Sequence, residues 1–202
     1  PEYVIAYLAI QYIGAVSVPA DKAAKAESME FLCDYVKPKL VLADGAFDKT
    51  KIQCVSYKEF FEKCYEEENP ALEDYQEPSE VALAEMLFTT GTTGRPKGAM
   101  LSIENIYASI HNTWHGVGML KEDVVLIPLP LNHSVGMRVL RTALYLGATV
   151  ILQNGFTFAR ELENNISNFQ CTGVVSVPAS LEVVYRQMQD KFPQIMGKLR
   201  YM

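Results

Sequence analysis

Apolar residues recur at helical spacing in the first part of the chain. At the start they are Val4, Ile5, Leu8, Ala9, Tyr12 and Ile13. Residues three and four positions apart share one face of an α-helix, so this pattern predicts an apolar helix that ends near Gly14. A second helix is predicted over 29–36, with Ser28 as its N-cap. A third is predicted over 57–68, opened by Ser56.

Short apolar runs bounded by glycine, proline or polar residues predict strands. These runs cover 15–19, 39–44, 51–55, 81–90, 98–102, 123–131, 148–153 and 172–178. Further helical patterns cover 103–116, 134–147, 159–169 and 179–192. Ser102 is placed to cap the first of these helices, and Gly147 is placed to end the second.

Strand and helix alternate from residue 123 onward, and the strands there are continuous apolar runs. Strands that are buried on both faces have this character, and they occur in parallel sheets covered by helices. The sequence therefore predicts an α/β fold with a mostly parallel sheet flanked by helices. We expect one domain over 1–202, with a polar, acidic connection at about 66–80.

Charge and composition narrow the classes of function. The chain has 202 residues, is 49% hydrophobic and carries a net charge of −6, which suits a globular domain with a core. Nine acidic and two basic residues lie between 57 and 80, so one segment accounts for the imbalance. A solvated face and loop explains such a segment. No basic patch indicates a nucleic-acid partner.

Neither the cysteines nor the apolar stretches indicate secretion or an integral membrane segment. The four cysteines form no C-x-x-C pair and have no metal-ligand spacing, which favours a reduced chain and a cytoplasmic location. The longest apolar stretch, 4–18, is short for a membrane helix, which needs about 20 apolar residues. Pro1 and Glu2 precede it, so it does not resemble a signal peptide. Because the chain starts within a predicted helix and without methionine, we expect a piece of a longer protein.

The segment FTTGTTGRPKGAM, residues 88–100, concentrates glycine and threonine between two apolar strands. Glycines allow backbone angles that other residues resist. Exposed N–H groups and hydroxyls suit anionic oxygens, and Lys97 adds a full positive charge, so the loop fits the phosphates of a nucleotide. A hairpin tip without a ligand is one alternative. A P-loop, G-x-x-x-x-G-K-[ST], is another, but Gly98 follows the lysine and no neighbouring hydroxyl is present to hold magnesium.

This segment resembles the phosphate loop of the adenylate-forming superfamily, which includes acyl-CoA synthetases, luciferase-like proteins and peptide-synthetase adenylation domains. The family's loop reads aromatic-T-S/T-G-T/S-T-G-x-P-K-G, and residues 88–98 match it. PLPLNHSVGM, residues 128–137, resembles the next family motif, P-x-x-H-x-x-G, at His133 and Gly136. Further similar segments are 6–44, 147–156 and 172–181.

The resemblance implies that the parent enzyme joins a carboxylic acid to ATP, giving an acyl-adenylate and pyrophosphate, and then forms a thioester with coenzyme A. ATP, Mg²⁺ and coenzyme A are the implied cofactors and co-substrates. The residues implied at the β- and γ-phosphates are Thr89, Thr90, Gly91, Thr92, Thr93, Gly94 and Lys97. Thr90 or Thr93 is also implied at Mg²⁺. His133 is implied as the catalytic residue, beside the acyl carboxylate and the α-phosphate. The residues implied along the acyl pocket are Val177, Pro178, Ala179 and Ser180.

The histidines have alternative interpretations. Without the resemblance, His133 would be a loop residue with no task; with it, a substrate-side role is favoured. His111 and His115 are four residues apart on a predicted helix, but Asn112 stands where H-E-x-x-H has glutamate. We interpret both as helix-face residues, and Trp114 as a packing residue.

The stretch from Val124 to Arg160 contains no Asp or Glu. In this region peptide-synthetase relatives carry an aspartate for the ammonium group of the substrate. A buried ammonium without a partner is costly, so a simple carboxylic acid is favoured over an amino acid. Arg138 and Arg141, on the following helix, are predicted at the surface; contact with an acidic tail of the substrate is the alternative.

Several family parts are not found in this sequence: the Y-G-x-T-E motif, the later aspartate for the ribose, and the C-terminal domain with its lysine. We therefore expect part of a large N-terminal domain that is inactive alone. The alternative is a non-catalytic nucleotide-binding or split-enzyme subunit that needs a partner chain. A truncated sheet would expose apolar surface, which would also permit a homo-oligomer.

Overall fold

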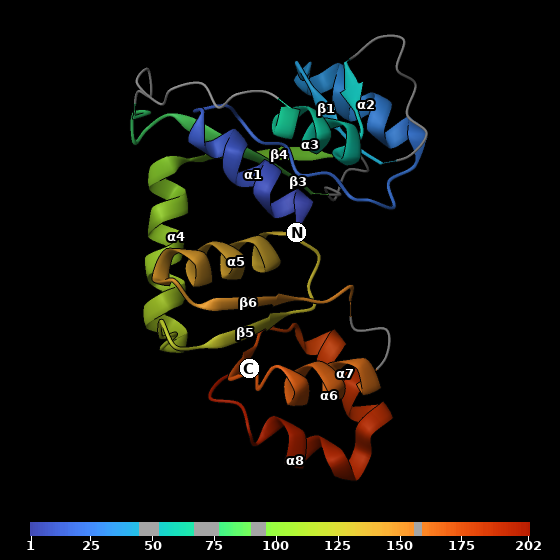
Figure 1. Cartoon of the computed structure of the whole chain (residues 1–202), viewed down its shortest axis with the longest axis vertical. Helices are drawn as coiled ribbons and strands as arrows, with labels where there is room; N and C mark the ends of the chain where they lie inside the picture. The colour runs from blue at the N-terminus through green and yellow to red at the C-terminus, as the bar shows by residue number, and fades with distance from the viewer. Residues whose placement is uncertain (45–52, 67–76, 90–95, 156–158) are drawn as a thin grey trace. The chain divides into compact units, whose positions relative to one another are not determined.

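The computed structural model describes residues 1–44, 53–66, 77–89, 96–155 and 159–202 (Figure 1). The chain divides into two compact units, Pro1–Pro78 and Ser79–Met202. Among the described residues, no helix is both long enough and apolar enough to cross a membrane. The predicted α/β fold is confirmed, whereas the assignment of the whole chain to a single domain stays a prediction.

In the described residues of the first unit, three helices accompany a small parallel sheet. The helices are α1 (Glu2–Tyr12), α2 (Ala26–Val36) and α3 (Tyr57–Glu66). The strands β1 (Val41–Leu42) and β2 (Cys54–Val55) run parallel, with Val41 opposite Cys54. Ser56 opens α3 as predicted, because its hydroxyl accepts a hydrogen bond from the Glu59 amide at 3.1 Å.

Two predictions for the first unit are wrong in detail. Residues 15–19 form only an isolated β-bridge at Ser17 instead of a strand. The chain turns at the end of α1, where the Ala15 amide donates to the Ile10 carbonyl at 3.0 Å. Gly14 allows this turn with a φ of +68°. Ser28 does not cap α2, which begins at Ala26 with Lys25 as N-cap, so Ser28 lies inside the first turn.

The second unit begins with an antiparallel hairpin and a helix. Strands β3 (Leu83–Thr89) and β4 (Lys97–Ser102) pair in a continuous register from Glu85 to Thr89, with a β-bulge or similar irregularity between Leu83 and Glu85, and α4 (Ile103–Val117) follows directly. Ser102 caps α4 as predicted: its hydroxyl accepts from the Asn105 amide, while the Asn105 side chain accepts from the Ser102 amide. This reciprocal cap satisfies two backbone N–H groups where the chain passes from β4 into α4.

The described residues in the rest of the second unit form a three-stranded parallel sheet, with the order β6-β5-β7, and the helices that pack on it. The elements alternate as predicted: β5 (Val124–Ile127), α5 (Ser134–Leu146), β6 (Thr149–Leu152), α6 (Ala159–Asn168), β7 (Gly173–Val174) and α7 (Pro178–Met188). Helix α5 lies on one side of the sheet, and α6 and α7 lie on the other (Figure 1).

Several of these elements are shorter than predicted. Strand β5 stops before Pro128, because proline has no N–H for the sheet and restricts the residue before it. Pro178 starts α7 instead of ending a strand, as proline often does in the first turn of a helix. The predicted helix over 179–192 ends at Met188, followed by η2 (Gln189–Lys191) and α8 (Phe192–Met196).

The core of this unit lies on both faces of β5. Leu126 packs into a buried cluster with residues of α6, α7 and α8, including Leu162, Val184 and Ile195. Val125 and Ile127 are also buried, and strand alternation points them to the face that α5 covers. Burial on both faces explains the continuous apolar run in the sequence.

Candidate functional site

The end of the β3–β4 hairpin carries the two described members of the predicted phosphate loop. Thr89 is the last residue of β3, Lys97 is the first of β4, and the two are directly opposite each other in the ladder. Both are exposed. Opposite residues of an antiparallel pair project to the same face, so the hydroxyl and the ammonium group stand on one side of the hairpin. The other predicted loop residues, Thr90, Gly91, Thr92, Thr93 and Gly94, lie outside the described residues.

Gly98 has a packing role that differs from the backbone freedom predicted for it. Its φ is not in the left-handed region, whereas a Cβ added at this position would lie 3.0 Å from Cζ of the Phe88 ring. Phe88 is directly opposite Gly98 in the ladder. The aromatic residue before the threonines therefore covers the glycine after the lysine, on the hairpin face opposite Thr89 and Lys97.

The predicted substrate residues follow two adjacent parallel strands. His133 follows β5, and Val177 follows β7; the strands pair with Leu126 opposite Val174. The helices after them, α5 and α7, lie on opposite sides of the sheet (Figure 1). The loops after β5 and β7 therefore diverge at the carboxyl edge of the sheet. Open parallel sheets bind ligands at such a switch point.

His133 is the N-cap residue of α5 and is exposed. Its carbonyl accepts from the Met137 amide at 3.1 Å, and its own amide donates to the Pro130 carbonyl at 3.3 Å. Gly136 allows this close turn, because a Cβ there would lie 2.5 Å from the Pro130 carbonyl oxygen. The imidazole therefore stands at the start of a helix, where the dipole and the first amides favour a negative group.

The predicted acyl-pocket residues form the start of α7. Val177 is the N-cap, its carbonyl accepts from the Ser180 amide at 2.9 Å, and Pro178 and Ala179 are exposed. Like His133, this segment places a helix N-terminus at the carboxyl edge of the sheet. The structure thus brings two of the predicted segments to adjacent strand ends.

Sequence reasoning missed a buried ion pair between the hairpin and helix α5. Arg141 of α5 donates to the carboxylate of Glu85 on β3, and the two side chains are 8% and 0% exposed. The prediction that Arg141 lies at the surface is wrong, because its position on α5 faces the hairpin. Arg138, one turn earlier, is exposed as predicted. The only signal in the sequence was an acidic residue inside the apolar run of β3.

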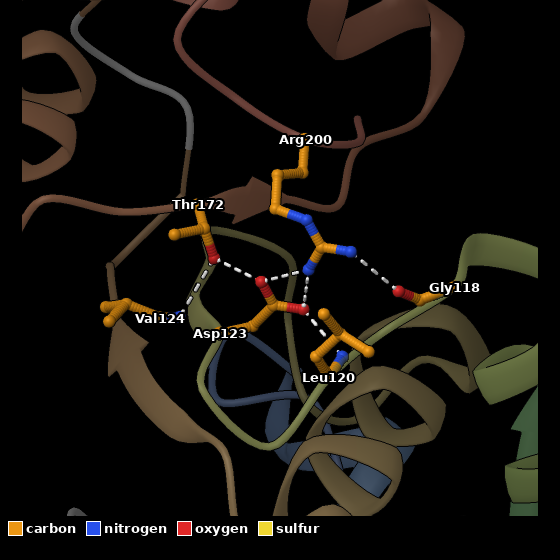
Figure 2. Close-up of polar contacts among 6 residues, drawn as sticks. All are labelled: Gly118, Leu120, Asp123, Val124, Thr172 and Arg200. Carbon is orange, nitrogen blue, oxygen red and sulfur yellow. Dashed lines mark hydrogen bonds and ion pairs between the residues drawn. The ribbon is translucent and has the colours of Figure 1, made fainter.

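A second network that the sequence reasoning missed lies at the amino ends of the parallel strands. It surrounds Asp123, which directly precedes β5 (Figure 2). Its carboxylate accepts from Arg200 Nη1 at 2.5 Å, from the Thr172 hydroxyl at 2.7 Å and from the Leu120 amide at 2.7 Å. The Thr172 hydroxyl accepts in turn from the Val124 amide at 3.0 Å. Burial raises the pKa of Asp123, but these donors outweigh it and leave the pKa below its usual value. The network ties the segment around Arg200 to the start of β5, away from His133.

The helix-face histidines sit in an aromatic row on α4. Trp114 stacks on His115 at a centroid distance of 4.6 Å, and His111 lies 4.5 Å from the Tyr107 ring. The buried Nε2 of His111 has no hydrogen-bond partner among the described residues. In the part of the chain that the structure describes, no three metal-binding side chains come together.

Comparison with known proteins identifies the class. The model of the family described as AMP-binding enzyme matches residues 1–202, so the chain belongs to this family, and the resemblance to adenylate-forming enzymes is confirmed.

Individual relatives are acid–CoA ligases by name. The 2-succinylbenzoate–CoA ligase of Bacillus velezensis is 28% identical over 181 residues, which cover 90% of this chain and 37% of that protein. The mitochondrial malonate–CoA ligase of Homo sapiens is 30% identical over 127 residues, covering 58% of this chain and 22% of that protein. The chain thus spans less than two fifths of the length of either relative.

Solved structures show the same fold. ATP-bound MatB from Rhodopseudomonas palustris matches with a TM-score of 0.84 and 21% identity, covering 99% of this chain and 42% of that chain. The o-succinylbenzoate CoA synthetase of Bacillus subtilis, in complex with ATP and magnesium, matches with a TM-score of 0.78 and 24% identity, covering 92% and 39%.

Proposed function

We propose that the whole protein activates a simple carboxylic acid with ATP and then transfers the acyl group to coenzyme A. The observation that carries this proposal is the family match over residues 1–202. Names of relatives support the acid–CoA ligase class, since they include ligases for 2-succinylbenzoate and malonate and a fatty acyl-CoA synthetase. A role in fatty acid metabolism is part of this proposal, and the exchange assay described below would identify the class of acid.

In this proposal the phosphate loop holds the β- and γ-phosphates of ATP. Lys97 offsets the negative charge that builds up when the carboxylate attacks the α-phosphorus and pyrophosphate leaves. Donors that are already in place stabilise this charge without reorganisation, which lowers the barrier. The position of Lys97 opposite Thr89, at the mouth of the loop, supports this role. Mg²⁺ at Thr90 or Thr93 is a prediction for residues outside the described part of the chain.

In this proposal His133 and Val177–Ser180 contact the carboxylic acid substrate. A carboxylate and a triphosphate repel each other, so the enzyme must hold both anions in contact. Two helix N-termini at adjacent strand ends supply donors for a carboxylate or an α-phosphate. The predicted absence of a counter-charge for an ammonium group still favours a simple acid. A cytoplasmic location, a homo-oligomer and the absence of a nucleic-acid partner remain predictions.

The test is carboxylate-dependent ATP–pyrophosphate exchange by the whole protein, with short, medium, long and aromatic acids. We expect exchange with at least one acid class. Lys97→Ala should lower kcat/KM for ATP about 100-fold, the typical cost of removing one preorganised charge-stabilising donor. The matched control is Lys191→Ala, an exposed lysine on η2, which should leave exchange unchanged.

The other outcomes identify other functions. If the protein hydrolyses ATP but shows no ATP–pyrophosphate exchange with any acid, adenylation is refuted. The loop would then belong to an ordinary nucleotide hydrolase. Nucleotide binding by the whole protein without exchange or hydrolysis would favour the non-catalytic or split-enzyme subunit.

A further inference from the structure

The buried ion pair Glu85–Arg141 joins the strand that leads into the phosphate loop to the helix that starts after His133. The carboxylate side chain is fully buried and the guanidinium nearly so. Burying two charges costs solvation that their attraction only partly offsets, so apolar residues of similar volume often give equal stability. Stability alone is therefore a weak explanation for a charged pair in this place.

The face of β3 that carries Glu85 also carries the predicted phosphate ligands. Glu85, Leu87 and Thr89 alternate along β3 and so project to one face. Lys97 is opposite Thr89, and its side chain joins the same face. Because Arg141 meets Glu85 on this face, the Thr89 and Lys97 side chains stand on the side of the hairpin that faces α5.

The proposed site has two halves, the phosphate loop and the segment around His133. The Glu85–Arg141 pair lies at similar distances along the chain from each half. Thr89 is four residues beyond Glu85, which is about 13 Å along a strand. His133 is eight residues before Arg141, which is about 12 Å along a helix. The end of β3 and the start of α5 point to the same side of this unit (Figure 1). From the ion pair, one rigid element thus extends to the phosphate loop and another to His133.

We propose that Glu85 and Arg141 are positioning residues that set the distance between the phosphate loop and His133, a proposal that rests on the proposed function. Each half of the site is built from its own element, so each substrate binds without the pair. The reaction needs the two halves in register, because small misplacements of reacting groups have large effects on rate. Loss of the pair therefore lowers kcat and leaves the KM values nearly unchanged.

The experiment compares four forms of the whole protein in ATP–pyrophosphate exchange: wild type, Glu85→Met/Arg141→Met, Glu85→Asp and Arg138→Met. The double variant removes both charges while keeping apolar volume, so it should fold. We expect its kcat to fall 10- to 100-fold, with the KM for ATP and for the acid changed less than threefold. Glu85→Asp keeps both charges but draws the carboxylate back by one methylene, so it should lose kcat to a smaller extent. Arg138→Met, on the exposed side of the same helix, should match wild type.

The outcomes separate this proposal from the proposed function. No exchange by wild type refutes the proposed function itself. Active wild type together with a folded double variant of full kcat overturns the positioning role. A double variant whose KM for ATP rises while kcat is kept also overturns it, because the pair would then support the loop alone. If thermal melting shows that the double variant does not fold, Glu85→Asp decides: full kcat refutes the proposal, and a lower kcat at unchanged KM supports it.

Discussion

Asp123→Asn tests whether the network at the start of β5 holds the second unit together. The carboxylate is 2% exposed and accepts hydrogen bonds from three different groups, those of Arg200, Thr172 and Leu120. Asparagine keeps the size of the side chain but removes the charge and replaces one accepting oxygen by a donor. The new NH2 group would face Arg200, Thr172 or the Leu120 amide, each of which also donates a hydrogen bond.

The magnitude follows from these contacts. A hydrogen bond to a charged group contributes about 1.5–3 kcal/mol, and at least one such bond is lost. The ion pair itself adds little, because Arg200 is 42% exposed and water screens its charge. We expect Asp123→Asn to lower the free energy of unfolding by about 2–3 kcal/mol at pH 7.

The effect should depend on pH in a defined direction. The folded pKa of Asp123 is lowered below its usual value, so this stabilisation is fully present above the unfolded pKa of about 3.9. It is lost as the pH falls further, through the folded pKa. Urea unfolding of wild type and Asp123→Asn at pH 7 and at successively lower pH measures this. The control is Asp190→Asn at an exposed position, expected within about 0.5 kcal/mol of wild type.

Two results would refute the reasoning. A difference below about 0.5 kcal/mol at pH 7 would mean that the network contributes no more than a surface pair. A difference of the expected size that stays constant down to the acid transition would mean that packing, and not the ionised carboxylate, accounts for the loss.

Three further predictions concern the site and its supports. Lys97→Ala should lower kcat/KM for ATP about 100-fold in pyrophosphate exchange, and a change below threefold would contradict a phosphate role. Gly136→Ala should destabilise the second unit by about 1–3 kcal/mol in urea unfolding, because the new methyl group meets the Pro130 carbonyl; equal stability would show that this turn relaxes at no cost. Ser102→Ala should cost about 1 kcal/mol through the lost cap of α4, while Ser102→Asn, which can also cap, should cost less; a larger loss in Ser102→Asn would argue against the capping role.

Local chemistry explains which parts of the fold the sequence predicted well. The Ser102 cap, the glycine that ends α5 and the prolines that stop β5 act on neighbouring residues, so their effect can be seen along the chain. The continuous apolar runs reflect burial on both faces of a sheet. Strand lengths were less predictable, as in β7, because a strand ends where its neighbour ends, and the neighbour is distant in sequence.

In the candidate site, too, local features could be predicted from the sequence, whereas contacts between distant residues could not. The glycine–threonine loop and His133 could be proposed as site residues from the sequence, because a phosphate or carboxylate needs particular residue types at close spacing. Arg141 was placed at the surface by sequence reasoning, because its partner Glu85 lies 56 positions away. Asp123 and Arg200 are 77 positions apart. No local pattern brings such residues together.

The amino-acid sequence by itself therefore determined most of the order of helices and strands and the buried character of the sheet, and it supplied the residue pattern on which the predicted phosphate loop rests. Only the tertiary structure decided that β5 lies between β6 and β7, so that the loops carrying His133 and Val177 leave adjacent strand ends. It also decided that one buried ion pair joins the hairpin to α5. The physical reason is that strand order and charge pairing depend on which surfaces exclude water together, and that is a property of the folded chain.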